Sequence, residues 1–421
     1  MKKNQTYDAS NIKVLTAFES IQKRPGMYIG DIEGGSGLAN MILEAVNFYL
    51  GDFYQNQCSK ISIVIYENND VEVSDNRRGL PSHLIDGKPF IEKMMTGLHV
   101  SKNQGLYSIA LAIVNALSAK VLITTTRDGF IWTQNYKYGT PGSLKKMGKA
   151  HYSGTSIRFQ PSKEHFPQMF FDQSFLTNRL QELSYFNENL EISFEDRSIR
   201  KAKFYSPKGL TDCVSALYMK KRGIYKGIEV IKIAGRSKDV ELEVAFGFVT
   251  SCGKQLSFVN GIKSIEGGTH VNGFIAGIAQ AIKIVSGCKL NASIWKRFIQ
   301  EGVLSAINIK LLEPRYAIST RDLLTNPEVF SITKKIISKQ LVLFLKENDS
   351  KCNKLLNKYI EQYIQFQYRK INHECGCTSS KFVEKILSKM FDKPDKYKKL
   401  VEQYKEVEMY LAECKKMQDA E

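Results

Sequence analysis

The spacing of apolar residues changes from a helical to a strand period between Leu38 and Val73. From Leu38 to Leu50 apolar residues recur at three- and four-residue intervals, which predicts a helix with one buried face. From Lys60 to Val73 isoleucines occupy every second position before an Asn-Asn-Asp turn, which predicts two strands. Helix and strand patterns that alternate in this way predict a fold of the α+β or α/β class.

The alternation continues along the chain and suggests three zones. The zones are residues 1–205, residues 206–345, and a charged helical tail over residues 346–421. A chain of 421 residues is expected to form about two to three domains. We expect strands over Lys120–Thr126, Thr155–Phe159, Val240–Thr250, Gln255–Asn260 and Ile307–Leu312, and helices over Leu106–Leu117, Val271–Ser286 and Pro327–Leu345.

Composition excludes several classes of protein. No apolar run approaches the roughly 18–20 residues that a membrane span needs, and the N-terminus lacks the apolar segment of a secretory signal. We therefore expect a cytoplasmic protein without membrane contact. Eight cysteines are scattered over the chain, which is typical of free thiols in a reducing compartment. The cluster His373–Cys377 has no second ligand group at metal-binding spacing, so no metal site is expected there.

The net charge of +17 points toward an anionic partner. Lysines and arginines that contact phosphates supply most of the non-specific affinity of proteins for DNA. A Lys-rich composition also follows from codon bias, so charge alone does not decide the matter. We expect DNA contact through a basic surface.

Two N-terminal stretches resemble the opening of the ATPase subunits of type IIA DNA topoisomerases, gyrase B and ParE. They are Tyr7–Leu15 (YDASNIKVL) and Arg24–Gly30 (RPGMYIG). Later motifs follow in the family's order, ending with Gly267–His270 (GGTH), and the likeness extends over about residues 7–330. The resemblance implies a GHKL (Bergerat) ATPase sandwich followed by a ribosomal-S5-like transducer domain. This fold contains no P-loop, and the chain has no P-loop motif.

The resemblance also implies roles for individual residues. Glu44 matches the family's general base, which takes a proton from the attacking water. Asp75 matches the adenine-binding aspartate, and Thr155 a threonine that supports the same hydrogen bonds. A buried carboxylate there would select a base with an amino group. The cofactor implied is ATP.

Other residues fall at the margins of the implied nucleotide site. Gly79 matches a glycine of the family's strand-end motif, and Arg78 and Asp52 match an Arg–Glu ion pair near the base. Tyr7 and Ile12 match the arm that, in the family, reaches the nucleotide of the partner protomer, so a homodimer is expected.

The chain departs from the family pattern at two positions close to the nucleotide. The family's magnesium-binding Asn, one helical turn after the general base, is Phe48 here, and Phe has no oxygen to offer Mg²⁺. Magnesium binding is therefore doubtful. A family glycine is replaced by Arg77, which adds bulk and charge, and we expect its side chain to reach solvent or a phosphate.

The implied phosphate-binding parts are altered as well. The glycine-rich stretch reads Gly105–Ala110 (GLYSIA), in which only Gly105 of three glycines is kept, so the lid is short and less able to cradle phosphates. The family's Gln-Thr-Lys loop reads Ser319–Arg321, and Arg321 keeps the positive charge of the γ-phosphate sensor with a different geometry.

Three functions remain open. The first is a gyrase-B-like clamp that dimerises and binds ATP weakly at a degenerate site. The second is a working ATPase of a split topoisomerase, whose gyrase A or ParC-like breakage subunit or Toprim-bearing subunit is another chain. The third is a nucleotide-independent protein that regulates gyrase or topoisomerase IV. Lys346–Glu421 lacks the acidic Toprim motifs, so no DNA cleavage is expected from this chain alone.

Overall fold

A computed structural model of the chain describes residues 15–50, 58–97, 109–197, 200–222, 229–249, 253–286, 299–300, 302–317 and 321–348. The chain divides into two compact units, Met1–Gly209 and Leu210–Glu421. The zone boundaries drawn from the sequence stay predictions, and the expected tail beyond residue 348 lies outside the described residues.

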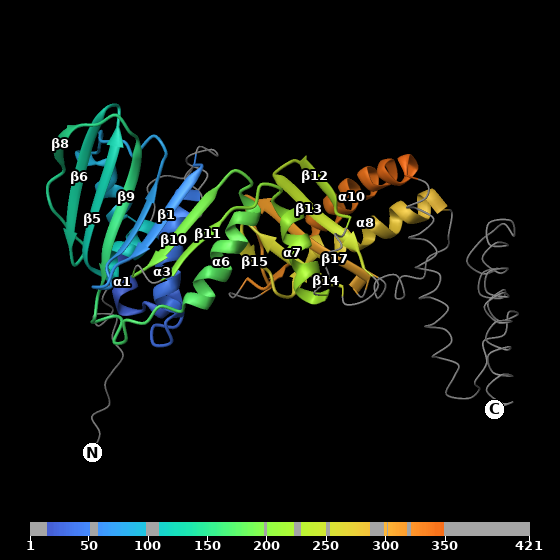
Figure 1. Ribbon diagram of the computed structural model, residues 1–421, viewed down its shortest axis with the longest axis horizontal. Helices are drawn as coiled ribbons and strands as arrows, with labels where there is room; N and C mark the ends of the chain where they lie inside the picture. Colours follow the sequence, from blue (N-terminus) through green and yellow to red (C-terminus); the bar gives the residue numbers. More distant parts are fainter. Residues whose placement is uncertain are drawn as a thin grey trace, which may run out of the picture. The chain divides into compact units, whose positions relative to one another are not determined.

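The first unit is built on one large sheet. Its strands are β1 (Lys60–Ile65), β2 (Val71–Asp75), β5 (Ser118–Arg127), β6 (Phe130–Lys137), β7 (Thr140–Pro141), β8 (Lys145–Lys149), β9 (Gly154–Pro161), β10 (Glu191–Asp196) and β11 (Arg200–Phe204). The order is β11-β10-β1-β2-β9-β5-β6-β7, with β8 also paired to β6 (Figure 1). Strands β1 and β10 are parallel and the other neighbours antiparallel. Two short strands, β3 (Leu84–Ile85) and β4 (Lys88–Pro89), form a separate hairpin.

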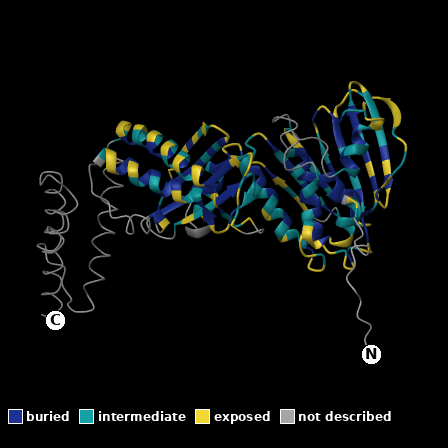
Figure 2. Ribbon diagram, turned by 180° about the vertical axis from the view of Figure 1, so that it is seen from behind, coloured by how far each residue is buried: buried dark blue, intermediate teal, exposed yellow. Residues whose placement is uncertain are grey.

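Helices bury the inner face of this sheet. They are α1 (Ala17–Lys23), α2 (Gly26–Ile29), α3 (Ser36–Leu50), α4 (Phe90–Thr96), α5 (Ala110–Ala116) and α6 (Gln173–Phe186). Helix α3 confirms the helix predicted over Leu38–Leu50, and the apolar residues of its predicted stripe are buried. Figure 2 shows buried residues, in dark blue, on helices and strands alike. Helix α1 begins with a capping box in which Thr16 accepts from the Glu19 N–H at 3.2 Å and Glu19 accepts in return.

The second unit combines a smaller sheet with long helices. Its main strands are β12 (Ile231–Ser237), β13 (Val240–Phe248), β14 (Lys254–Val259), β15 (Ile262–Lys263) and β17 (Val303–Leu311), and its helices include α7 (Leu210–Arg222), α8 (Thr269–Ser286) and α10 (Pro327–Glu347). The sheet order is β12-β13-β17-β14-β15. The short strands β16 (Gly267–Gly268) and β18 (Leu323–Leu324) pair in parallel, each just before one of the long helices α8 and α10.

Close packing of α8 on α10 depends on glycine. A Cβ at Gly273 would lie 2.7 Å from the Phe330 backbone oxygen, and one at Gly277 would lie 2.7 Å from Ile337 Cβ. The predicted helices over Val271–Ser286 and Pro327–Leu345 are confirmed. Strand β17 begins at Val303, four residues before the predicted start. No helix in the described ranges is long and apolar enough to cross a membrane.

Candidate functional site

The carboxylate of Asp75 lies buried at the end of β2. Its Oδ1 accepts a hydrogen bond of 2.7 Å from the backbone N–H of Thr155 on the neighbouring strand β9. The backbones approach closely here, because a Cβ on Gly154 would lie 2.4 Å from the Asp75 carbonyl oxygen. The structure thus brings together Asp75 and Thr155, the two residues that the family resemblance assigned to base recognition.

A hydroxyl network fixes the turn that follows Asp75. Thr155 Oγ1 lies 3.1 Å from Thr125 Oγ1 on β5, and Thr125 Oγ1 accepts from the Leu80 N–H at 2.6 Å. Gly79 sits in this turn with φ +82°, and a Cβ there would lie 2.2 Å from the Thr126 carbonyl oxygen. Glycine is therefore required for the turn to reach β5.

Arg77 contradicts the sequence interpretation, which placed its side chain in solvent or against a phosphate. The side chain turns inward, and Arg77 Nε donates to Asp75 Oδ2. The side chains of Arg77 and Asp75 are only 2% and 1% exposed. The guanidinium carbon also lies 5.2 Å from the centre of the Tyr49 ring, a distance suited to a cation–π contact. The side chain turns inward because the buried Asp75 carboxylate, two residues away, needs a cation.

Burial and charge act in opposite directions on Asp75. Removal from water raises the pKa of its carboxyl group, while the Arg77 guanidinium and the Thr155 N–H favour the ionised form and oppose that rise. Cys58 lies close enough to feel the same charges. Burial, and then the Asp75 carboxylate, raise the pKa of the Cys58 thiol to about 11.

Helix α3 supplies the other wall of this region. The hydroxyl of Tyr49 donates to the carbonyl oxygens of Val73 at 3.0 Å and of Thr155 at 3.2 Å, so the helix is fastened to β2 and β9. Phe48 is buried in the core and meets Tyr49 edge-on at 5.4 Å. Glu44, one helical turn earlier, is partly buried.

Phe48 stands at the position of the family's magnesium ligand, and its side chain offers no ligand atom there. Over the parts of the chain that the structure describes, no group of three or more His, Cys, Asp or Glu residues could hold a metal ion. Asp75 and Thr155, which the resemblance assigns to base recognition, lie together, whereas Phe48 replaces the expected metal ligand.

The remaining expected site residues are exposed or undescribed. Arg78 pairs with Asp128 at 3.0 Å, and both side chains are 64% exposed. Arg321 is exposed in the second unit with φ +62°. Tyr7, Ile12, Asp52 and Gly105 lie outside the described residues.

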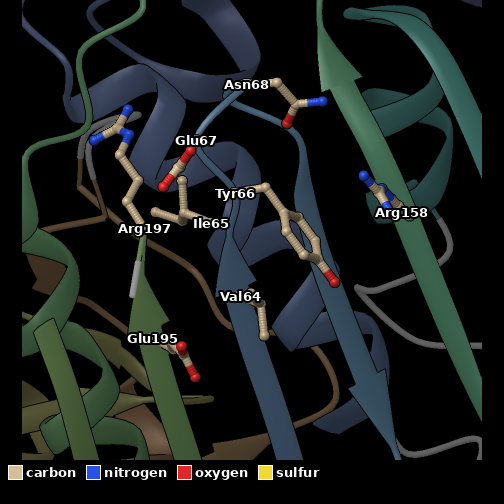
Figure 3. Close-up of a pocket in the computed structure, with 8 residues that line it drawn as sticks. All are labelled: Val64, Ile65, Tyr66, Glu67, Asn68, Arg158, Glu195 and Arg197. Carbon is tan, nitrogen blue, oxygen red and sulfur yellow. The ribbon is translucent and has the colours of Figure 1, made fainter. Parts of the chain in front are cut away.

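A hollow of about 430 Å³ opens elsewhere on the first unit. Figure 3 shows Arg158 and Arg197 on opposite sides of it, with Tyr66 and Glu67 between them. Asp75 pairs with Ile61 near the start of β1, whereas Tyr66 follows the end of that strand. The hollow is thus separate from the Asp75 region and contains none of the predicted site residues.

Comparison with known proteins gives the family. The family model for DNA gyrase B matches residues 209–375. The DNA gyrase B protein of Clostridium acetobutylicum is 34% identical over 367 residues, covering 82% of this chain and 57% of that protein. The DNA gyrase B protein of Archaeoglobus fulgidus is 31% identical over 378 residues, covering 84% of this chain and 58% of that protein. This chain belongs to the DNA gyrase B family.

Comparison with solved structures supports the fold. The ATPase domain of Thermus thermophilus gyrase B has a TM-score of 0.74 at 24% identity, covering 85% of this chain and 98% of that one. The topoisomerase IV ATP-binding domain of Francisella tularensis has a TM-score of 0.68 at 26% identity, covering 83% and 97%. The predicted fold, a GHKL ATPase domain followed by a transducer domain, is confirmed. The chain spans somewhat more than half the length of the curated relatives it matches.

Proposed function

We propose that this gyrase B family member is an ATP-binding and transducer module that acts as a dimerising clamp in topoisomerase-linked DNA topology, with a degenerate Mg–ATP site and no DNA cleavage of its own. The main support is the buried Asp75 carboxylate, bonded to the Thr155 N–H at 2.7 Å. An acceptor built into the sheet in this way suits a base with an exocyclic amino group. The implied cofactor is ATP, bound weakly.

The degenerate character rests on helix α3. Phe48 is 4% exposed and belongs to the hydrophobic core of the first unit. Because protein interiors are close-packed, a core side chain such as Phe48 cannot move aside by a rotamer change to make room for a metal ligand. In the sequence, Glu44 keeps the position of a general base and Arg321 that of a phosphate sensor, but position 48 offers no metal ligand. We infer that turnover is slow or absent.

DNA contact is proposed for the outer face of β5, β6, β8 and β9. Lys120 and Leu122 point away from the core, alternating with buried residues of β5, and Lys120 lies directly opposite Lys137 on β6. Like charges opposite each other destabilise a sheet. An anionic partner bound beside the two lysines would offset their repulsion. All five residues of β8, three of them lysines, are exposed.

The local sequence strengthens this charge asymmetry. From Gly129 to Lys163 the chain contains no Asp or Glu. No ion pair is found for Lys120, Lys137 or Lys145 among the described residues, whereas Lys201 and Lys203 on β11 pair with glutamates at 3.1 and 2.7 Å. Phosphate groups of a duplex are the partner that such a face fits.

The DNA surface is tested by salt-dependent binding of a short duplex. Replacing Lys120, Lys137 and Lys145 by Ala should reduce the slope of log K against log salt by about 0.9 for each phosphate that the variant no longer neutralises. The matched control replaces Lys201 and Lys203, whose charges are already neutralised by glutamates. Equal reductions in the two variants would contradict a DNA surface on this face.

A second function is favoured by two observations on the same site. Phe48 is buried and Arg77 covers Asp75, as expected of a nucleotide-independent protein that regulates gyrase or topoisomerase IV through its clamp surfaces. A homodimer and a gyrase A or ParC-like or Toprim-bearing partner are proposed for the clamp and are compatible with the regulator as well.

Calorimetric titration with a non-hydrolysable ATP analogue separates these functions. The clamp predicts weak binding that Asp75→Asn abolishes, without phosphate release from ATP above the level of Glu44→Ala. Tight binding with Glu44-dependent turnover would replace the clamp by the ATPase of a split topoisomerase. No binding at millimolar analogue, with the wild-type chain folded, would leave the nucleotide-independent regulator.

A further inference from the structure

Both oxygens of the Asp75 carboxylate already have donors inside the chain. Oδ1 accepts from the Thr155 backbone N–H, and Oδ2 accepts from Arg77 Nε. The carboxylate is 1% exposed, so an incoming ligand cannot reach it while these neighbours stay in place. A base that donates its amino group to Asp75 must therefore first displace a donor.

Of these donors, the Arg77 guanidinium is the one that can leave. The backbone N–H of residue 77 also donates to Asp75 and stays in place. The Thr155 N–H belongs to the backbone of β9, which pairs with β2 on one side and β5 on the other. Arg77 follows the end of β2, and its donor sits at the end of a long side chain that can rotate outward without breaking the sheet. Tyr49, whose ring lies under the guanidinium, is held by hydrogen bonds to Val73 and Thr155 and stays in place.

The guanidinium is chemically similar to the group that it excludes. A planar N–H donor that bonds a carboxylate and rests on an aromatic ring has the features of an amino-bearing nucleobase, with a positive charge added. In a water-excluded setting this charge strengthens the contact with Asp75. Arg77 therefore forms a stronger hydrogen bond with the Asp75 carboxylate than a neutral base can.

We propose that Arg77 is an internal ligand of the base site, and that a nucleotide with an exocyclic amino group binds only in competition with it. The proposal rests on the proposed function for the identity of the ligand. The affinity of the site is then reduced by the fraction of molecules in which Arg77 has left Asp75. Arg77 therefore sets how tightly the clamp holds its nucleotide.

The test compares Arg77→Gly with Arg236→Gly in the full chain. Arg236 is the control because it is 73% exposed, pairs with Glu241 at 3.2 Å on the second unit and is none of the predicted site residues. The ligand is a non-hydrolysable ATP analogue, and circular dichroism verifies that each variant is folded. We expect Arg77→Gly to bind at least about tenfold more tightly than the wild type, and Arg236→Gly to bind within about twofold of it. Adding Asp75→Asn to Arg77→Gly should remove the gain.

Each other outcome has a definite meaning. If the wild type binds the analogue through Asp75 and Arg77→Gly binds no more tightly, Arg77 is not a competitor and this proposal fails while the proposed function stands. If neither the wild type nor folded Arg77→Gly binds, the nucleotide site itself fails, and the proposal fails with it. A gain that survives Asp75→Asn would show that Arg77 blocks some other contact, which also overturns the proposal.

Discussion

Asp75 in the first unit and His270 in the second are both ionisable groups that the fold removes from water, yet the units treat them differently. The Asp75 carboxylate receives a cation and a backbone N–H. His270, at the start of α8, is fully buried, and neither ring nitrogen finds a hydrogen-bond partner among the described residues. Burial lowers the pKa of its imidazole to about 4. One group has partners that favour its charged form against the effect of burial, and the other is kept neutral by burial.

The difference indicates where a ligand can act. A charged group whose partner is a mobile side chain can exchange that side chain for a ligand. A neutral ring enclosed on all sides has packing as its main role. On this contrast we propose Asp75 as the functional centre of the described residues, and four predictions test the proposal.

The largest effect is expected from removing the buried cation. Arg77→Leu leaves the Asp75 carboxylate buried with backbone N–H donors alone, those of Thr155 and residue 77, and should lower the free energy of unfolding by about 3–5 kcal/mol. Arg78→Leu, which breaks an exposed pair, should cost about 1 kcal/mol or less. Urea unfolding at neutral pH measures both. Similar costs in the two variants would mean that Arg77 does not stabilise Asp75.

The next effect is the pH dependence caused by His270. The unfolded chain binds a proton at this residue near pH 6.5, whereas the folded chain binds it only near pH 4. Stability is therefore lost as the pH falls from about 6.5 to about 4 and is unaffected above that window. The loss should be about 3 kcal/mol.

His270→Leu isolates this contribution from other titrating groups. The variant should show a fall in unfolding free energy from pH 7 to pH 4 that is smaller than the wild-type fall by about the same amount, about 3 kcal/mol. Parallel curves for the two proteins would show that His270 finds a partner and would remove the contrast with Asp75.

A smaller effect is expected from the hydroxyl network beside Asp75. Thr155→Val removes the 3.1 Å contact between the Thr155 and Thr125 hydroxyls and should cost about 1–2 kcal/mol. Thr124→Val, on the opposite face of β5, should cost about 0.5 kcal/mol or less. Thermal unfolding of the pair measures the difference. An equal cost would mean that the network does not support the site.

The smallest effect concerns Cys58, which senses the charges of the site without contributing to it. With a thiol pKa of about 11, its alkylation at pH 8 should be about a hundredfold slower than that of a cysteine with an ordinary pKa. Arg77→Leu should slow it further, because Arg77 lowers this pKa. Peptide mapping after timed alkylation gives the rate. A faster reaction in the variant would mean that Arg77 shields Cys58 sterically.

Much of the fold could be predicted because its signals are local. The apolar stripe of α3 and the alternation along β1 and β2 depend only on near neighbours in the sequence. The proximity of Asp75 and Thr155 was implied by the family resemblance, and antiparallel pairing of β2 with β9 brings them together.

The features that could not be predicted depend on contacts between distant segments. The direction of Arg77 is decided by the Asp75 carboxylate together with the Tyr49 ring on α3, and no local pattern reports such a combination. Strands β6 and β8 were missed because the burial of β6 does not alternate clearly along its length and every residue of β8 is exposed. The sequence signal for the direction of Arg77 was a cationic residue two positions after Asp75, the aspartate that the resemblance assigned to the base.

The most direct test of the proposed degenerate, Arg77-occupied site is the affinity of the wild-type chain for a non-hydrolysable ATP analogue, measured with excess Mg²⁺ and again with a chelator. Arg77 over Asp75 and Phe48 in place of a metal ligand predict weak binding, with the two affinities within about threefold of each other. Tight binding that appears only with Mg²⁺ would contradict such a site, because it would require an open base site and a metal site that these residues do not provide.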